Sequence, residues 1–208
     1  MSAVVDASQP IAELALPPVP NSEFWRLSLK QYHEMVQQGI LTEDDPVELW
    51  EGILVRKMTK SRAHCWATEL ARQTLAPFVP AGWHVEAQES VTVLGSEFEP
   101  DVVIVLGIAR DYVDENPRAA DLALVIEISD SSLARDQGFK KTIYARAGVP
   151  VYWILNLVEG RVEVYTDPDG AADKPDYRQR REFGAADEVP LVIGDQEVAR
   201  ISVRELLP

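Results

Sequence analysis

Two continuous apolar runs constrain the fold of this chain more than any other sequence feature. Residues 102–106 read VVIVL, and residues 122–128 read LALVIEI. A strand with one solvent-exposed face alternates apolar and polar residues, whereas a strand covered on both faces does not. The two runs therefore predict central strands of a sheet that has other elements packed on both of its faces.

The segments around these runs predict a single α+β domain, in which a mixed β-sheet is flanked by α-helices. Helices are expected at 28–38, 61–78 and 133–147, because capping residues precede them or glycine and proline follow them. Further strands are expected at 47–50, 53–55, 83–93, 151–157 and 161–166, with one or two more in the C-terminal tail. The polar stretch 171–182 predicts a loop.

Length and composition suit one domain with an N-terminal extension. The chain has 208 residues; residues 1–22 are rich in alanine and proline and predict a flexible arm, which leaves 23–208 for the domain. No apolar run reaches the roughly 18 residues of a membrane helix, and no signal peptide is apparent. Cys65 is the only cysteine, so an intrachain disulfide is excluded and a cytoplasmic location is expected.

The net charge of −14 argues against one function class and favours another. A passive nucleic-acid binder needs a basic surface, which this chain lacks overall, although an enzyme with a local basic patch remains compatible. An excess of acids also favours a carboxylate cluster that holds a metal ion. A nucleophilic pair of Cys65 and His64 is rejected, because neighbours on a helix point roughly 100° apart.

One acid lies just before the first apolar run and another lies within the second, at positions where the two can come close together. Asp101 immediately precedes the first run, and Glu127 lies near the end of the second. If the two strands pair antiparallel, the start of the first lies beside the end of the second. Two carboxylates at that edge would raise each other's pKa, and a divalent cation between them would remove the repulsion. The spacing therefore predicts a metal site.

A lysine in the following helix can reach the same edge. Asp136, Lys140, Tyr144 and Ala147 fall on one stripe of the expected helix 133–147. Because this helix begins soon after Glu127, its first turns stay near the acids. The ammonium group of Lys140 could then orient an attacking water or neutralise charge on a phosphate.

The ordered set of these residues resembles the Uma-type putative restriction endonuclease family, within the PD-(D/E)XK nuclease superfamily. The likeness covers roughly residues 25–165. The residues that carry it are Pro100-Asp101, Glu127-Ile128-Ser129, Asp136, Lys140, Tyr144, Gly148-Val149 and Tyr152-Trp153, together with VELWEG at 47–52 and His64.

The resemblance implies a restriction-endonuclease-like core and Mg²⁺-dependent hydrolysis of DNA phosphodiester bonds, with Mn²⁺ as a substitute. It implies that Asp101 and Glu127 are the metal ligands, and that His64 and Glu48 are further members of the site. Lys140 would replace the lysine that usually stands two residues after the acid.

The chain departs from the family pattern at three positions. Ser129 stands two residues after the acid, where the lysine is usual. Val151 and Asn156 replace acids often seen beside the Tyr-Trp pair.

A structural role is the alternative for each candidate site residue. These alternatives are a backbone cap for Asp101, a buried ion pair with Lys140 or Arg135 for Glu127, a solvated charge for Lys140, a hydrogen bond for His64 and an exposed position for Glu48.

Three functions are compatible with these residues. The leading hypothesis is a Mg²⁺-dependent nuclease that acts on DNA. The second is a catalytically inactive nuclease-fold protein that works as a binding or assembly module, and the third is a metal-dependent hydrolase of a small phosphoester. Restriction-type folds often pair to cut two strands, which favours a homodimer.

Overall fold

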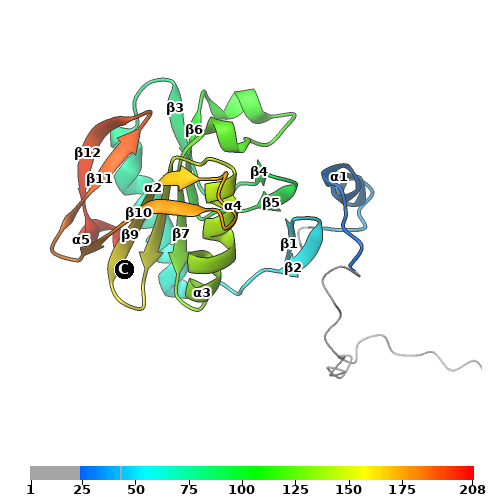
Figure 1. Cartoon of the computed structure of the whole chain (residues 1–208), viewed down its shortest axis with the longest axis horizontal. Coiled ribbons are helices and arrows are strands. Elements are labelled where there is room, and N and C mark those ends of the chain that lie inside the picture. The colour runs from blue at the N-terminus through cyan, green and yellow to red at the C-terminus, as the bar shows by residue number, and fades with distance from the viewer. Residues whose placement is uncertain (1–23, 43) are drawn as a thin grey trace, which may run out of the picture.

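The computed structural model describes residues 24–42 and 44–208 (Figure 1), so the expected arm at 1–22 lies outside the described residues. The central sheet has the strand order β10-β9-β8-β7-β6-β3. Its strands are β3 Trp83–Glu86, β6 Val102–Leu106, β7 Leu122–Ser129, β8 Val151–Asn156, β9 Arg161–Asp169 and β10 Asp176–Gly184. Only β7 and β8 are parallel; the other neighbours are antiparallel. The predicted mixed sheet is confirmed.

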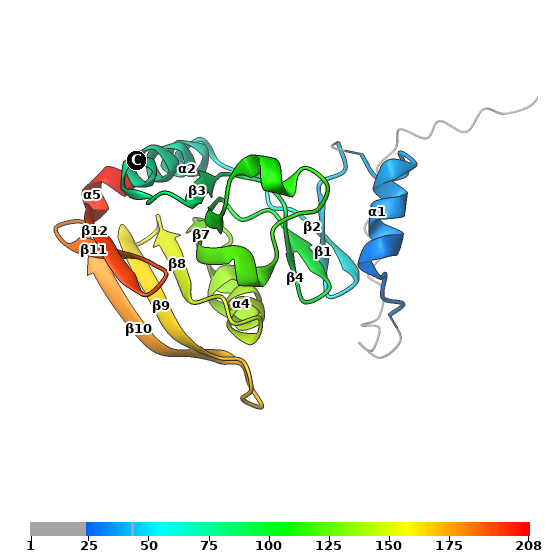
Figure 2. The same ribbon diagram turned by 90° about the horizontal axis from the view of Figure 1, so that it is seen from above.

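Both faces of the central sheet are covered, as the apolar runs predict. Ile104, Ile126 and Trp153 belong to a core cluster with α2 Arg62–Leu75, β11 Glu188–Ile193, β12 Gln196–Ser202 and α5 Val203–Leu206. Val103 and Val125 face the other way, toward a second cluster that includes residues of α4 Lys141–Arg146. Figure 2 shows α2 and α4 on opposite sides of the sheet.

A smaller sheet extends the molecule at the end opposite to β11 and β12 (Figure 1). Its order is β2-β1-β5-β4, with bounds β1 Val47–Trp50, β2 Ile53–Arg56, β4 Val91–Val93 and β5 Ser96–Phe98. The helix α1 Leu29–Gln37 lies beside it and begins with the predicted capping box of Ser28 and Gln31. Leu27 N donates to Gly52 O at 2.8 Å, which ties the start of α1 to the β1–β2 turn.

The helical segment after β7 is not one regular helix. It consists of α3 Leu133–Arg135, a π-helical turn η5 Asp136–Lys140, and α4 Lys141–Arg146. A π turn holds more residues than an α turn, so it changes the direction in which the following side chains point. This segment connects β7 to the parallel strand β8, a connection that needs a crossover over one face of the sheet.

Two expectations about strands are wrong. The stretch 83–93 does not form one strand; β3 belongs to the central sheet and β4 to the small sheet, and between them Gln88 has a φ of 60°. The polar stretch 171–182 is not a loop throughout, because β9 extends to Asp169 and β10 begins at Asp176. As an edge strand, β10 exposes most of its side chains and therefore has the composition of a loop.

None of the helices in the described part of the chain is long and apolar enough to cross a membrane.

The β1–β2 turn offers a test of how tightly α1 is joined to the small sheet. Gly52 has a φ of +84°, and a Cβ there would lie 2.7 Å from Leu27 O and 2.8 Å from Arg26 Cβ. Gly160 also has a positive φ, +62°, but a Cβ there meets nothing within 4 Å. Gly160→Ala should cost about 1–2 kcal/mol of unfolding free energy from strain alone. Gly52→Ala should cost about 1–3 kcal/mol more, because the backbone must move.

Urea unfolding of both variants and the wild type measures this difference. Equal losses of stability would contradict the close packing of Leu27 on the turn.

Candidate active site

The antiparallel pairing of β6 and β7 brings the two predicted acids to one edge of the sheet. Val102 pairs with Ile126, so Asp101 and Glu127 are the next residues along the two strands. The Ile128 amide donates a hydrogen bond of 2.8 Å to Asp101 Oδ2, which joins the acid directly to the end of β7. Both side chains are buried, with exposed fractions of 4% and 3%. The convergence follows from the predicted strand pairing.

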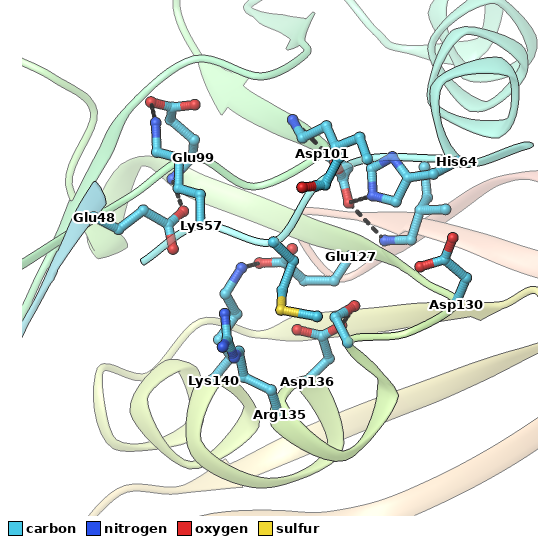
Figure 3. Close-up of a pocket in the computed structure, with 15 residues that line it drawn as sticks. Glu48, Lys57, His64, Glu99, Asp101, Glu127, Asp130, Arg135, Asp136 and Lys140 are labelled. Atoms are coloured by element: carbon cyan, nitrogen blue, oxygen red, sulfur yellow. Dashed lines mark hydrogen bonds and ion pairs between the residues drawn. The ribbon is translucent and has the colours of Figure 1, made fainter. Parts of the chain in front are cut away.

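All five predicted site residues line one pocket (Figure 3): Glu48, His64, Asp101, Glu127 and Lys140. The other lining residues are Lys57, Met58, Thr59, Lys60, Glu99, Ile128, Asp130, Ser132, Arg135 and Asp136. The lining residues come from β1 of the small sheet, the loop before α2 and its first turn, the residues just before β6, the end of β7 with the turn after it, and the segment α3–η5. The pocket therefore lies where the two sheets and the helical segment meet.

Lys140 contacts Glu127 from the last position of the π turn. Its Nζ lies 2.9 Å from Glu127 Oε1, and the hydroxyl of Tyr144 donates to the same oxygen at 3.1 Å. Lys140 is only 7% exposed, so it is not a solvated helix charge. Among the described residues no group donates to Glu127 Oε2, which leaves one carboxylate oxygen for another partner.

Burial and neighbouring charges act on both members of this pair. The pKa of Glu127 is raised to about 8. Burial is the largest cause, the carboxylates of Asp136 and Asp101 add to the rise, and the charge of Lys140 offsets part of it. Burial alone would lower the pKa of Lys140, but the charges of Glu127, Glu48 and Asp136 outweigh burial and raise it. The neighbouring carboxylates therefore favour the charged form of Lys140, and a second cation at the pocket would relieve the crowding of the acids.

Asp101 is oriented by a histidine at the start of α2. Ser61 caps this helix, as predicted, and its hydroxyl accepts from the His64 amide at 3.1 Å. His64 Nε2 lies 3.0 Å from Asp101 Oδ2, and His64 Nδ1 is buried with no partner among the described residues. On the other carboxylate oxygen, Lys60 Nζ is 3.7 Å from Asp101 Oδ1.

Glu48 reaches the pocket from β1 and is buried, in contrast to the exposed position considered for it. The Trp50 indole donates to Glu48 Oε2 at 3.0 Å, and the Glu99 amide donates to Oε1 at 3.1 Å. Glu48 thus has fixed partners from the small sheet.

Asp136 is a lining residue that the sequence placed on the Lys140 stripe without assigning it to the site. It is 1% exposed, and its Oδ2 accepts from the hydroxyls of Ser129 at 2.6 Å and Ser132 at 2.5 Å. Its other oxygen, Oδ1, is buried with no partner among the described residues. The signal that could have identified Asp136 was its spacing of four residues from Lys140. Ser129, at the position where the family usually has lysine, thus holds Asp136.

The two other departures from the family pattern lie away from the pocket. Val151 and Asn156 are buried and are not among its lining residues. The amide nitrogen of Asn156 donates 3.0 Å hydrogen bonds to Glu159 and to Glu163. These departures therefore leave the wall of the pocket unchanged.

Glu163, a buried acid that does not line the pocket, also supports the helical segment. Glu163 on β9 is fully buried, and Gln137 of the π turn donates to both of its oxygens, at 2.9 and 3.0 Å. The Tyr165 hydroxyl at 2.7 Å and Arg180 at 2.9 Å also donate to it. This network fastens the π turn, and with it Lys140, to the central sheet.

The donor set fits a hard divalent cation that keeps part of its water shell. Carboxylate oxygens are the ligands that Mg²⁺ prefers, and Mg²⁺ sites often use only one or two of them. Across residues 24–42 and 44–208, no group of three or more His, Cys, Asp or Glu side chains is arranged to hold a metal ion. As two carboxylates, Asp101 and Glu127 would fit only an ion that completes its coordination with water and substrate oxygens.

The fold and its similarities define the class of protein. The mixed α+β domain has a restriction-endonuclease-like fold. It is similar to the crystal structure of a putative nuclease belonging to DUF820 from Anabaena variabilis ATCC 29413, with a TM-score of 0.64. The two chains are 17% identical, and the match covers 86% of this chain and 97% of the other. At this identity the likeness concerns the fold alone.

The family follows from the sequence profile. Residues 29–198 match the family Uma2, described as "Putative restriction endonuclease", and the chain belongs to this family. The predicted family resemblance is confirmed. None of the curated proteins matches the chain.

The Glu163 network predicts a pH-dependent contribution to stability. Burial raises the pKa of Glu163, but hydrogen bonds from Tyr165, Asn156 and Gln137 and the charge of Arg180 outweigh it, so the pKa is lowered. A lowered carboxyl pKa stabilises the fold above the ordinary value of 4.5, and the stabilisation is lost as pH falls. Glu163→Gln should therefore cost about 1–3 kcal/mol near neutral pH.

The cost of this substitution should shrink as the pH falls from neutral to well below 4.5, because the wild-type carboxyl takes up its proton there. Thermal unfolding of the wild type, Glu163→Gln and the exposed control Glu205→Gln at both ends of this pH range measures it. A cost that does not vary with pH would contradict a stabilising charge at Glu163.

Proposed function

We propose that this protein is a nuclease that hydrolyses phosphodiester bonds of DNA with Mg²⁺, which Mn²⁺ can replace. One observation carries the proposal: Asp101, Glu127 and Lys140, which are distant in sequence, converge in one pocket. Membership in a family described as restriction endonucleases supports it. The pocket combines two buried carboxylates, which can bind a metal ion, with a buried cation. This combination suits a reaction in which negative charge develops on a phosphate oxygen.

Asp101 and Glu127 are the proposed metal ligands. When bound by them, Mg²⁺ supplies Lewis-acid stabilisation of a phosphate oxygen and lowers the pKa of a water molecule. The protein's part is to hold the two carboxylates in place before substrate arrives. His64 and the Ile128 amide fix Asp101, while Lys140 and Tyr144 fix Glu127.

Lys140 is proposed to act on the reacting phosphate or on the attacking water. Its ammonium group has three donors, of which one is used toward Glu127, so the others can face an oxygen of the substrate or of water. A fixed positive charge in a buried site stabilises developing negative charge more strongly than the same charge in bulk water. Glu48 and His64 are proposed as further site residues that orient their neighbours.

Cleavage of DNA tests these assignments. Asp101→Asn, Glu127→Gln and Lys140→Met should each lower kcat/KM for plasmid or oligonucleotide cleavage by about 100-fold or more. The first two remove a charged ligand of the proposed metal ion, and the third removes the charge proposed to act on the phosphate or the water. Removing metal with EDTA should abolish cleavage in the wild type, and Mn²⁺ should restore it.

The matched control is Asp173→Asn, an exposed position in the loop before β10, which should cleave like the wild type. Cleavage by Asp101→Asn at the wild-type rate would remove Asp101 from the proposed site.

The alternative function, a catalytically inactive binding or assembly module, is favoured by one contact. The ion pair between Lys140 and Glu127 neutralises both charges without a metal ion. The net charge of −14 points the same way, because it weakens the attraction of the whole surface to DNA.

Calorimetric titration of Mn²⁺ separates the two functions. For the nuclease we expect one binding event in the wild type, weakened about 10-fold or more by Glu127→Gln, because the substitution removes a charged ligand. An inactive module would show no Mn²⁺ binding that depends on Glu127.

Pairing of two chains to cut both strands of DNA remains part of the proposal. Analytical ultracentrifugation of the full chain distinguishes a homodimer from a monomer.

A further inference from the structure

One cation in the pocket wall differs from the others in its partners. Lys57, Lys60 and Lys140 each have a carboxylate oxygen within ion-pair distance. Arg135 lines the same pocket, yet within residues 24–42 and 44–208 it makes no ion pair with an acid. In a chain with an overall charge of −14, a cation left without an acidic partner beside a proposed phosphate site needs an explanation.

Neutral contacts hold the Arg135 guanidinium in place. Its Cζ lies 5.0 Å from the centre of the Trp50 ring, and Nη1 donates to the Arg56 carbonyl oxygen at 3.4 Å. The Trp50 ring is itself stacked on Phe139, with ring centres 4.7 Å apart and an interplanar angle of 5°. An aromatic face orients a guanidinium without neutralising its charge, so the group remains available for an anion.

Arg135 and Lys140 rise from the same helical segment toward the pocket (Figure 3). They differ in depth: Lys140 is buried, whereas Arg135 is partly exposed. A chain of phosphates that enters the pocket would meet Arg135 at the rim and Lys140 inside. A planar guanidinium can bind two oxygens of one phosphate at once, which a lysine cannot do.

We propose that Arg135 binds a phosphate of the DNA strand adjacent to the phosphate that is cleaved. This inference rests on the proposed function, and it adds a residue that recognises the polynucleotide through a phosphate next to the cleaved one, which a small phosphodiester lacks. Arg135 is in this scheme a substrate-binding residue, and it offsets locally the repulsion between an acidic protein and DNA.

The first test measures DNA binding as a function of salt. Fluorescence anisotropy of a labelled duplex, with Ca²⁺ in place of Mg²⁺, gives the Kd of the full chain. Each phosphate contact contributes about 0.9 to the slope of log K against log salt concentration. Arg135→Gln should weaken binding about 5- to 10-fold near 0.1 M salt and reduce the slope by about 0.9.

Two variants control for charge and folding. Arg200→Gln removes the same charge from an exposed position on β12, and it should keep the wild-type slope. Arg135→Lys keeps a cation at the rim and should restore most of the slope. If Arg135→Gln loses stability because it leaves Trp50 uncovered, Arg135→Lys is compared with Arg200→Lys instead. Arg135→Lys should then weaken DNA binding, because a lysine cannot bind two oxygens of one phosphate, whereas Arg200→Lys should not. Neither variant should change the slope much, because both keep the charge.

The second test compares substrates with one and with several phosphates. Arg135→Gln should raise KM for DNA more than it lowers kcat. Its loss of kcat/KM on DNA should exceed its loss on bis(p-nitrophenyl) phosphate by about 5-fold or more. Equal losses on both substrates would point to a structural role and overturn the inference.

The outcomes for this inference and for the proposed function are separable. DNA binding with an Arg135-dependent slope, but without cleavage, supports the inference while the proposed hydrolysis fails. Cleavage of DNA with a slope that Arg135→Gln leaves unchanged supports the hydrolysis and overturns the inference. A wild-type chain that binds no DNA, or that loses as much affinity in Arg200→Gln as in Arg135→Gln, also overturns it.

Discussion

The antiparallel pairing of β6 with β7 is the constraint on which the rest of the site depends. Val102 opposite Ile126 places Asp101 next to the end of β7, where the Ile128 amide holds its carboxylate. Side chains alternate between faces along a strand, so a slip of one residue in this register would exchange the β6 side chains that pack into the two core clusters, Val102 and Ile104 on one face and Val103 and Val105 on the other. The packing of the core on both faces therefore also determines where the acids meet.

The site keeps charges in the interior at a cost in stability that packing elsewhere must offset. Desolvation of a carboxylate and an ammonium is expensive, and a buried ion pair of this kind seldom stabilises a fold more than apolar residues would. Glu127 and Lys140 nevertheless lie in the interior of a pocket that also contains Asp101 and Asp136. Such an arrangement is expected where the charges serve a ligand, since structural packing alone does not require them.

Much of the fold and of the pocket could be predicted from local patterns. Uninterrupted apolar runs identify central strands, because a strand that is buried on both faces needs an apolar residue at every position. The caps at Ser28 and Ser61 mark helix starts, because each cap contacts a residue only three positions away. The meeting of Asp101 and Glu127 needed one assumption about strand direction. The roles of these residues are still predictions, because a shared pocket establishes where the side chains lie and does not establish what they do.

Other features could not be predicted because they depend on distant partners. The alternation across 83–93 gave no sign that the chain passes from one sheet to another, since each half alternates on its own. The edge strand β10 has one neighbour and an exposed face, so its polar composition hid it. Glu48 could be assigned to the site only through the family resemblance, because its position depends on how the small sheet packs against the helical segment, which no local pattern encodes.

The π turn that carries Lys140 has a consequence for protein engineering. Removing one residue from this turn to make a regular α-helix would rotate everything beyond it by roughly 100°, and the ammonium group with it. Transplanting this lysine into another scaffold would thus require the wide turn as a unit, along with the serines that hold Asp136 and the glutamine bound to Glu163. The part that can be transferred is the five-residue π turn together with the hydrogen bonds that hold its Asp136 and Gln137. A single point substitution would not reproduce it.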